Sequence, residues 1–91
     1  MPTYVYILRC ADGRLYYGST GDLSRRLAEH REGLSRWTSA RLPGQLVYFE
    51  EHETAAHTRR REQSLKNGRT RRKAIERMIA EFPPEKLALF A

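Results

Sequence analysis

Four tyrosines near the N-terminus are the first residues whose side chains could do chemistry. They occur as two pairs, Tyr4 with Tyr6 and Tyr16 with Tyr17. A phenol can orient a reactant by hydrogen bonding, and it can act as a base if nearby positive charge lowers its pKa from about 10. In most hairpins such tyrosines are cross-strand packing partners, so packing is the default interpretation. A catalytic role therefore needs further residues of matching chemistry.

A cation and an imidazole follow the second pair of tyrosines. Arg26 and His30 are four positions apart, so a helix would bring them to one face. The planar donors of an arginine suit the negative charge of a phosphoryl transition state. A histidine can orient a tyrosine hydroxyl or accept its proton. The alternatives are a phosphate-docking or ion-paired arginine and a structural histidine.

A strongly basic segment occupies the second half of the chain, where Glu62 is the only acid between Thr54 and Ile75. Clustered cations bind the phosphate backbone without regard to base sequence, whereas a solvated helix face would show the same composition. We expect the contacts with nucleic acid to come from exposed cations here and on the preceding helix. These are Arg25, Arg59, Lys66, Arg69, Arg71, Arg72 and Lys73.

Glu62 has two interpretations. It could neutralise neighbouring arginines through an ion pair, which is the simpler one when no other motif is considered. It could also hold a divalent cation, because magnesium takes only one or two protein carboxylates and keeps several waters. A single carboxylate beside a bound phosphate is therefore sufficient for a magnesium or manganese ion.

Composition and charge limit the class of protein. The chain has 91 residues, 40% of them hydrophobic, with 17 Lys and Arg against 11 Asp and Glu, which gives a net charge of +6. This balance favours a polyanionic partner, with nucleic acid ahead of an anionic membrane. The single cysteine forms no internal disulfide, and no Cys/His cluster has zinc spacing. With no leader and no membrane-length apolar run, we expect one cytoplasmic domain and no membrane partner.

The residue pattern predicts an α+β fold with a small three-stranded sheet, antiparallel or mixed, flanked by about three helices. Aromatic and branched residues predict strands at 4–10, 15–18 and 46–50. Helices are expected at about 22–32, from Thr54 to a break at Asn67 and Gly68, and from there to a stop at Pro83 and Pro84. Residues 33–45 read as an irregular connection, and 82–91 as a C-terminal tail of the single domain 1–91.

The turn of the first hairpin decides which tyrosines share a face. A three-residue loop, Ala11 to Gly13, would pair Leu8 with Tyr16, and Tyr6 and Tyr16 would then lie on one face. A two-residue Asp-Gly turn would bring Tyr17 there instead. Both turns are common, so local chemistry leaves the choice open.

The motifs YVYIL, YYGST and RRLAEH, followed by an isolated Glu on a later helix, resemble the GIY-YIG nuclease superfamily. The resemblance covers about residues 3–80 and is closest to the short, single-domain bacterial branch. It departs from the family pattern in having Tyr4 in place of the first glycine and no clear counterpart of the asparagine that often follows the glutamate. The residues that match the family's active site are Tyr6, Tyr16, Arg26, His30 and Glu62.

The resemblance implies a metal-dependent endonuclease that hydrolyses phosphodiester bonds, with DNA more expected than RNA. Glu62 would hold one Mg²⁺ or Mn²⁺, Arg26 would stabilise the transition state, and Tyr6 would be the base. Structured or single-stranded DNA in repair or recombination is the expected substrate, and a protein partner could supply targeting. The alternative is a non-catalytic nucleic-acid-binding module with the same fold. A site that unites Tyr6 and Tyr16 requires the three-residue loop, with Gly13 at positive φ.

Overall fold

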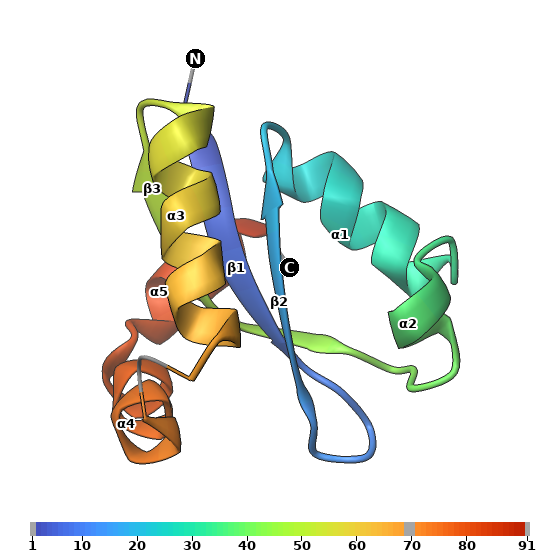
Figure 1. Cartoon of the computed structure of the whole chain (residues 1–91). Helices are drawn as coiled ribbons and strands as arrows, with labels where there is room; N and C mark the ends of the chain where they lie inside the picture. Colours follow the sequence, from blue (N-terminus) through green and yellow to red (C-terminus); the bar gives the residue numbers. More distant parts are fainter. Residues whose placement is uncertain (1, 69–70, 91) are drawn as a thin grey trace.

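The centre of the fold is a three-stranded antiparallel sheet with the strand order β2-β1-β3. We describe it from a computed structural model, which covers residues 2–68 and 71–90. The strands are β1 (Thr3–Arg9), β2 (Leu15–Thr20) and β3 (Gln45–His52). Figure 1 shows helices on both sides of these strands. The α+β class and the three-stranded sheet are as predicted.

The β1–β2 hairpin has the three-residue loop. Gly13 has a φ of 86°, and its N–H donates to the Cys10 carbonyl at 2.9 Å. The Cys10 N–H in turn donates to the Arg14 carbonyl at 2.9 Å. Tyr16 therefore lies opposite Leu8. This confirms the register that places Tyr6 and Tyr16 on one face of the sheet.

The first helix, α1 (Leu23–Arg31), begins where its cap predicts. The Asp22 side chain accepts a hydrogen bond from the Arg25 N–H at 3.1 Å, and Leu23 and Leu27 form the buried stripe. The connection expected to be irregular contains a one-turn helix, α2 (Arg36–Ser39). A single turn is too short to show a helical period, so the sequence pattern did not reveal it.

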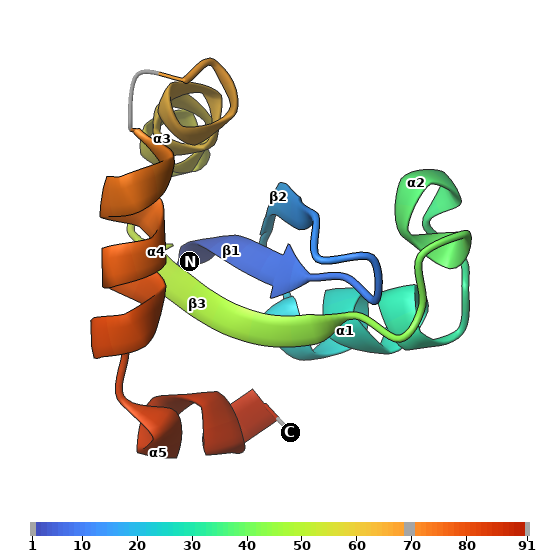
Figure 2. The same cartoon turned by 90° about the horizontal axis from the view of Figure 1, so that it is seen from below.

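The C-terminal half contains α3 (Ala55–Lys66) and α4 (Arg72–Glu81), followed by α5 (Pro84–Leu87) and a 3₁₀ turn, η1 (Ala88–Phe90). The Thr54 side chain caps α3 by accepting from the His57 N–H at 3.2 Å. Pro84 begins α5, because proline fits the first turn of a helix. The described residues thus form five α-helices where about three were expected, and the supposed tail is structured through Phe90. Figure 2 shows α5 following α4 at the edge of the molecule.

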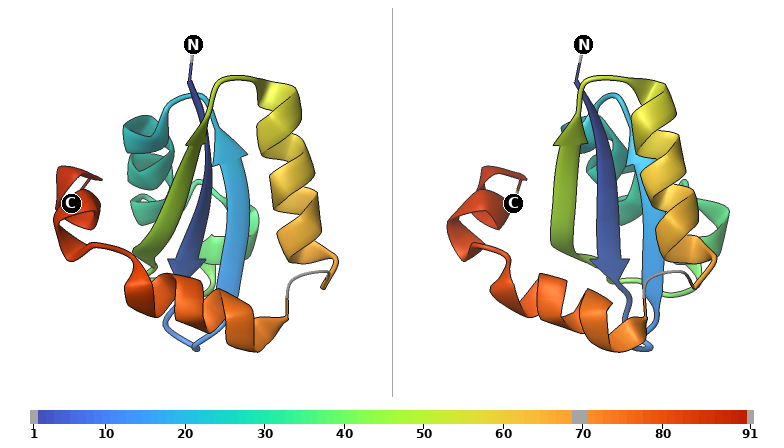
Figure 3. Two further views of the ribbon diagram at one scale, coloured as in Figure 1. Left: turned by 90° about the vertical axis from the view of Figure 1, so that its left-hand side faces the viewer. Right: turned by 60° about the vertical axis from the view of Figure 1, so that its left-hand side comes forward.

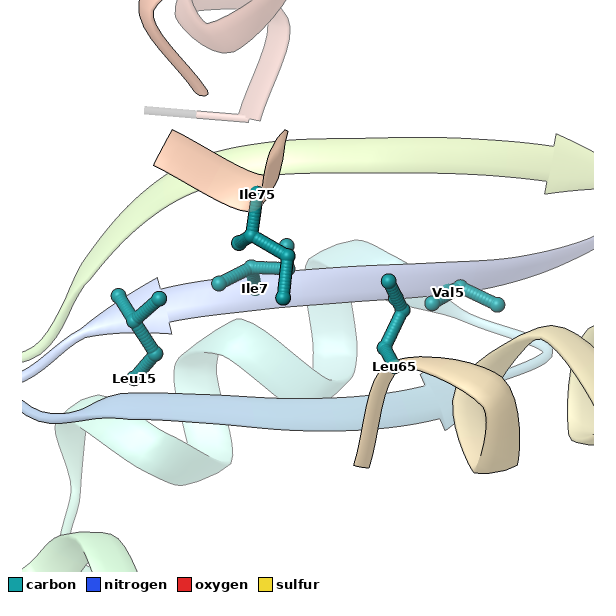
Figure 4. Packing of buried hydrophobic residues seen from close by; sticks show 5 residues of the cluster. All are labelled: Val5, Ile7, Leu15, Leu65 and Ile75. Atoms are coloured by element: carbon teal, nitrogen blue, oxygen red, sulfur yellow. The ribbon is translucent and has the colours of Figure 1, made fainter. Parts of the chain in front are cut away.

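Alternate residues of β1 enter two separate cores. Val5 and Ile7 pack with Leu15, Leu65 and Ile75 on the face that α3 and α4 cover (Figures 3 and 4). On the opposite face, Tyr6 and Leu8 pack with Leu23 and Leu27 of α1, and Phe90 covers this second core. The central strand is therefore buried on both faces, and one of them carries the tyrosines.

Candidate functional site

The innermost part of the site is a chain of hydrogen bonds between Tyr6, His30 and Thr38. The Tyr6 hydroxyl lies 2.8 Å from His30 Nε2, and His30 Nδ1 lies 2.8 Å from Thr38 Oγ1. The Thr38 hydroxyl donates to the Ser35 carbonyl at 3.4 Å, so it accepts from His30 Nδ1. His30 Nε2 is then the acceptor, and the Tyr6 hydroxyl is the donor. This network fixes the orientation of both rings.

Burial keeps both partners of this hydrogen bond neutral. Burial, together with the nearby positive charge of Arg26, lowers the pKa of His30 to about 4. Burial, followed by the neighbouring Tyr16, raises the pKa of Tyr6 above its ordinary value, and Arg26 only partly opposes this increase. Tyr6 has no exposed surface. These observations disfavour Tyr6 as the base that contacts water, and they favour a role in positioning His30.

Gly18 makes the position of Tyr6 possible. The two residues pair across β1 and β2, and the phenol ring lies over the Gly18 backbone. A Cβ atom on Gly18 would lie 2.5 Å from both Cζ and the hydroxyl oxygen of Tyr6. The packing of Tyr6 thus requires the glycine of the YYGST motif, and sequence reasoning did not recognise this requirement.

Tyr16 and Arg26 form the accessible side of the site. The half-buried ring of Tyr16 lies 6.1 Å from the Tyr6 ring and 5.0 Å from the His30 ring, measured between centroids. The Arg26 guanidinium donates to Glu29 Oε1 at 2.9 Å. This hydrogen bond and proximity to the phenols of Tyr6 and Tyr16 raise the pKa of Arg26, so it stays charged. Four of the five expected site residues therefore converge where α1 crosses β1 and β2.

The partners Glu29 and Thr38 were not identified from the sequence. Glu29 had a signal, because it is three positions after Arg26 on the same helix. Thr38 had none, because its role depends on α2 folding back to His30.

Glu62 lies on α3, on the other side of the edge strand β2. Its side chain is 13% exposed, and Oε2 lies 2.7 Å from Lys66 Nζ one turn later. Arg59, one turn earlier, lines a shallow pocket with Ser19 and Thr20 at the end of β2. Arg59, Glu62 and Lys66 share one face of α3 by helical spacing, and Arg59 of that face lies at the end of β2. Within residues 2–68 and 71–90, no group of three His, Cys, Asp or Glu side chains could hold a metal ion.

The expected nucleic-acid contacts fall into two groups. Arg25, Arg59, Arg71 and Lys73 are exposed. Lys66 pairs with Glu62, and Arg72 pairs with Glu76 at 3.0 Å. Arg69 lies outside the described residues. The ion pairs reduce the charge that Lys66 and Arg72 offer to a phosphate, which the composition of the segment did not indicate.

The helices of the described residues include none that is long and apolar enough to cross a membrane.

Comparison with known proteins agrees with the motifs and the geometry. Residues 2–87 match the model of the GIY-YIG catalytic domain. A UPF0213 protein of Staphylococcus aureus is 39% identical over 79 residues, which are 86% of this chain and 94% of the relative. A UPF0213 protein of Haloquadratum walsbyi is 42% identical over 74 residues, covering 68% and 83% of the two chains.

A solved structure shows the same fold. The solution NMR structure of the UPF0213 protein BH0048 from Bacillus halodurans superposes with a TM-score of 0.58 at 32% identity, covering 97% of this chain and 94% of the other. The family match, the UPF0213 relatives and the packing of Tyr6 over Gly18 all agree. The chain belongs to the GIY-YIG family of nuclease domains.

Proposed function

We propose that this protein is a metal-dependent endonuclease that hydrolyses phosphodiester bonds in DNA, structured or single-stranded, in repair or recombination. The observation that carries the proposal is the convergence of Arg26 with the phenols of Tyr6 and Tyr16 beside the neutral His30. A fixed cation next to an accessible phenol is what hydrolysis of a phosphodiester needs from a protein.

Tyr16 is the group that we assign to the attacking water, because Tyr6 is fully buried and committed to His30. As the general base, Tyr16 would accept a proton from the water as the water oxygen attacks phosphorus. The phosphorus–oxygen bond to the leaving sugar then breaks. Arg26 would stabilise the negative charge that accumulates on the phosphate oxygens, and Glu29 holds its guanidinium in place.

Glu62 is suited to holding one Mg²⁺ or Mn²⁺. Lys66 engages Oε2, which leaves Oε1 as the oxygen that can face a cation at the β2 edge. A single carboxylate suffices, because magnesium retains waters and binds phosphate oxygens directly. Such an ion, when bound, supplies Lewis acidity that stabilises the departing oxygen.

The alternative is a nucleic-acid-binding module that keeps the fold without cutting. The Glu62–Lys66 ion pair is the specific observation in its favour, because a carboxylate neutralised by lysine needs no metal. In either case we propose DNA, more than RNA, as the ligand in the cytoplasm. A protein partner would choose the substrate, because the basic side chains described here carry no base-specific signal.

The deciding experiment incubates the pure protein with labelled single-stranded, duplex and flap DNA in magnesium, in manganese or with a chelator. The nuclease proposal expects cleavage that the chelator abolishes and that Arg26→Ala loses. Binding of the same substrates without cleavage in either metal would favour the binding module.

A further inference from the structure

The connection between α1 and β3 carries exposed apolar side chains, one of which, Trp37, lies next to Tyr16. Among the described residues, 2–68 and 71–90, four large apolar side chains are exposed, and three of them fall in residues 34–42, namely Leu34 at 67%, Trp37 at 37% and Leu42 at 36%. The Trp37 ring is the one closest to the chemistry, because its centroid lies 5.6 Å from that of Tyr16. The indole is 37% exposed beside Tyr16, so part of the ring is accessible to a ligand.

The indole is held rigidly although part of it is exposed. The guanidinium carbon of Arg41 lies 4.1 Å above the Trp37 ring, and Arg41 Nη1 donates to the Trp37 carbonyl at 2.8 Å. Arg41 Nε lies 3.3 Å from Asp12 Oδ2 in the hairpin loop. The Arg41 carbonyl also accepts from the Ala11 N–H at 3.0 Å, which ties the same two segments together. Trp37 is therefore fixed between Tyr16, Arg41 and the turn of the hairpin.

The chemistry of this surface matches an unpaired nucleobase. Single-stranded nucleic acids bind where aromatic side chains stack on bases and arginines contact the backbone. Arg36, which precedes Trp37 in the sequence, and Arg31 at the end of α1 are both exposed and supply the cations. A paired base is already stacked on its neighbours inside the duplex, so its faces are not available to an indole.

We propose that Trp37 packs against an unpaired nucleobase next to the phosphate that Arg26 and Tyr16 engage. This assigns the protein to substrates that have a single-stranded nucleotide at the position of cleavage. It rests on the proposed function only for the location of the phosphate, because contact between Trp37 and a base requires no cleavage.

Intrinsic fluorescence tests the contact directly, because Trp37 is the only tryptophan of the chain. The wild-type protein is titrated in chelator with a short single-stranded oligonucleotide, with an oligonucleotide of the same length lacking bases, and with a blunt duplex. We expect saturable quenching by the first and much less by the other two. Equal quenching by the oligonucleotide without bases, or none by any of them, would overturn the contact.

Variants then measure its contribution to affinity. We expect Trp37→Leu to weaken binding of the labelled single strand about tenfold, with little change for the strand without bases, and Trp37→Phe to retain most of the affinity. Leu89→Ala, which removes an exposed apolar side chain at 75% exposure on η1, is the matched control and should bind as wild type. A Trp37→Leu protein, folded by circular dichroism, that binds single strands as tightly as the control would refute the proposal.

The two proposals fail separately. Base-dependent quenching without any cleavage in metal would sustain the contact and reject the nuclease. Cleavage in metal without base-dependent quenching would sustain the nuclease and reject the contact.

Discussion

The phenol ring of Tyr6 lies over Gly18 so closely that even a methyl group at position 18 would come within 2.5 Å of the hydroxyl oxygen. The contact follows from the register, in which the two residues pair across β1 and β2. It directs the hydroxyl toward His30 Nε2, 2.8 Å away. One glycine thus determines the geometry of the innermost hydrogen bond of the site.

Gly18→Ala should displace the Tyr6 ring and break its hydrogen bond with His30. We expect a loss of about 1–3 kcal/mol in the free energy of unfolding, because the added carbon overpacks a full core, and a loss of cleavage. Urea unfolding and the cleavage assay measure both. Gly21→Ala is the matched control, since nothing lies within 4 Å of a Cβ there. Equal behaviour of the two variants would show that Tyr6 adjusts without cost.

The two tyrosines should respond differently to removal of their hydroxyls. Tyr6→Phe leaves the buried His30 Nε2 without its partner, so we expect a loss of about 1–3 kcal/mol in unfolding free energy. Tyr16→Phe should change that free energy by less than about 1 kcal/mol, because Tyr16 is half-buried, and it should remove cleavage, because the proposed mechanism assigns Tyr16 to the attacking water. Full cleavage by Tyr16→Phe would show that a group other than Tyr16 acts as the base.

His30 should make the protein less stable in mild acid. Its pKa is lowered to about 4 in the folded state from 6.5, so between these values the unfolded chain binds a proton that the folded protein does not. Stability is therefore complete above pH 6.5 and falls as the pH drops toward 4, by at most about 3 kcal/mol. Urea midpoints across this range measure it. His30→Gln should lose the slope, and the exposed His57→Gln should keep it.

Glu62→Gln separates the metal hypothesis from the ion pair. If Glu62 holds the metal, the variant should bind substrate as well as wild type or more tightly, through reduced repulsion, and lose most metal-dependent cleavage. If it only neutralises Lys66, cleavage should persist and stability should change by about 1 kcal/mol or less. Glu81→Gln, at the exposed end of α4, is the control. Full cleavage by Glu62→Gln in magnesium would overturn the metal assignment.

Binding of DNA should weaken steeply with salt. Arg71→Glu combined with Lys73→Glu should lower the affinity for all base sequences alike and reduce the salt dependence, because both side chains are exposed cations at the start of α4. Arg72 is a poorer choice, since it pairs with Glu76. Fluorescence anisotropy at several salt concentrations measures the slope, with Lys86→Glu on α5 as the control. If the salt dependence of the affinity is the same in this variant as in wild type, Arg71 and Lys73 belong to a solvated helix face and do not contact DNA.

Elements that depend on local chemistry could be predicted from the sequence. The strands and the helix starts at Asp22 and Thr54 each rest on a few neighbouring residues, and each is present. Local chemistry left the hairpin turn open, and the three-residue loop was expected only because the family resemblance requires Tyr6 and Tyr16 on one face. The convergence of Tyr6, Tyr16, Arg26 and His30 also followed, because motif spacing and register determine it together.

Features that depend on tertiary contacts could not be predicted. The single turn of α2 is stabilised by Thr38, whose partner His30 is eight residues away, and α5 with η1 is held by Phe90 against Tyr4 and Phe49. The burial of Tyr6 was also missed. The spacing of tyrosines on β1 and β2 does not indicate which ring the helix above will cover, so the sequence pointed to Tyr6 as the base, whereas the burial of Tyr6 is the reason that we propose Tyr16.

Because alternate residues of β1 enter two different cores, positions that affect folding stability alternate along this strand with a position that belongs to the candidate site. The side chains of Val5 and Ile7 belong to the α3–α4 core, whereas that of Tyr6 between them belongs to the core beside α1 and to the site. Selection can therefore act on neighbouring positions for different reasons. At Val5 and Ile7 it acts on side-chain volume, and at Tyr6 it acts on hydrogen bonding. Substitutions at Val5 and Ile7 can therefore raise the thermal stability of the domain. They avoid the loss of activity that often accompanies stabilising changes beside a catalytic residue.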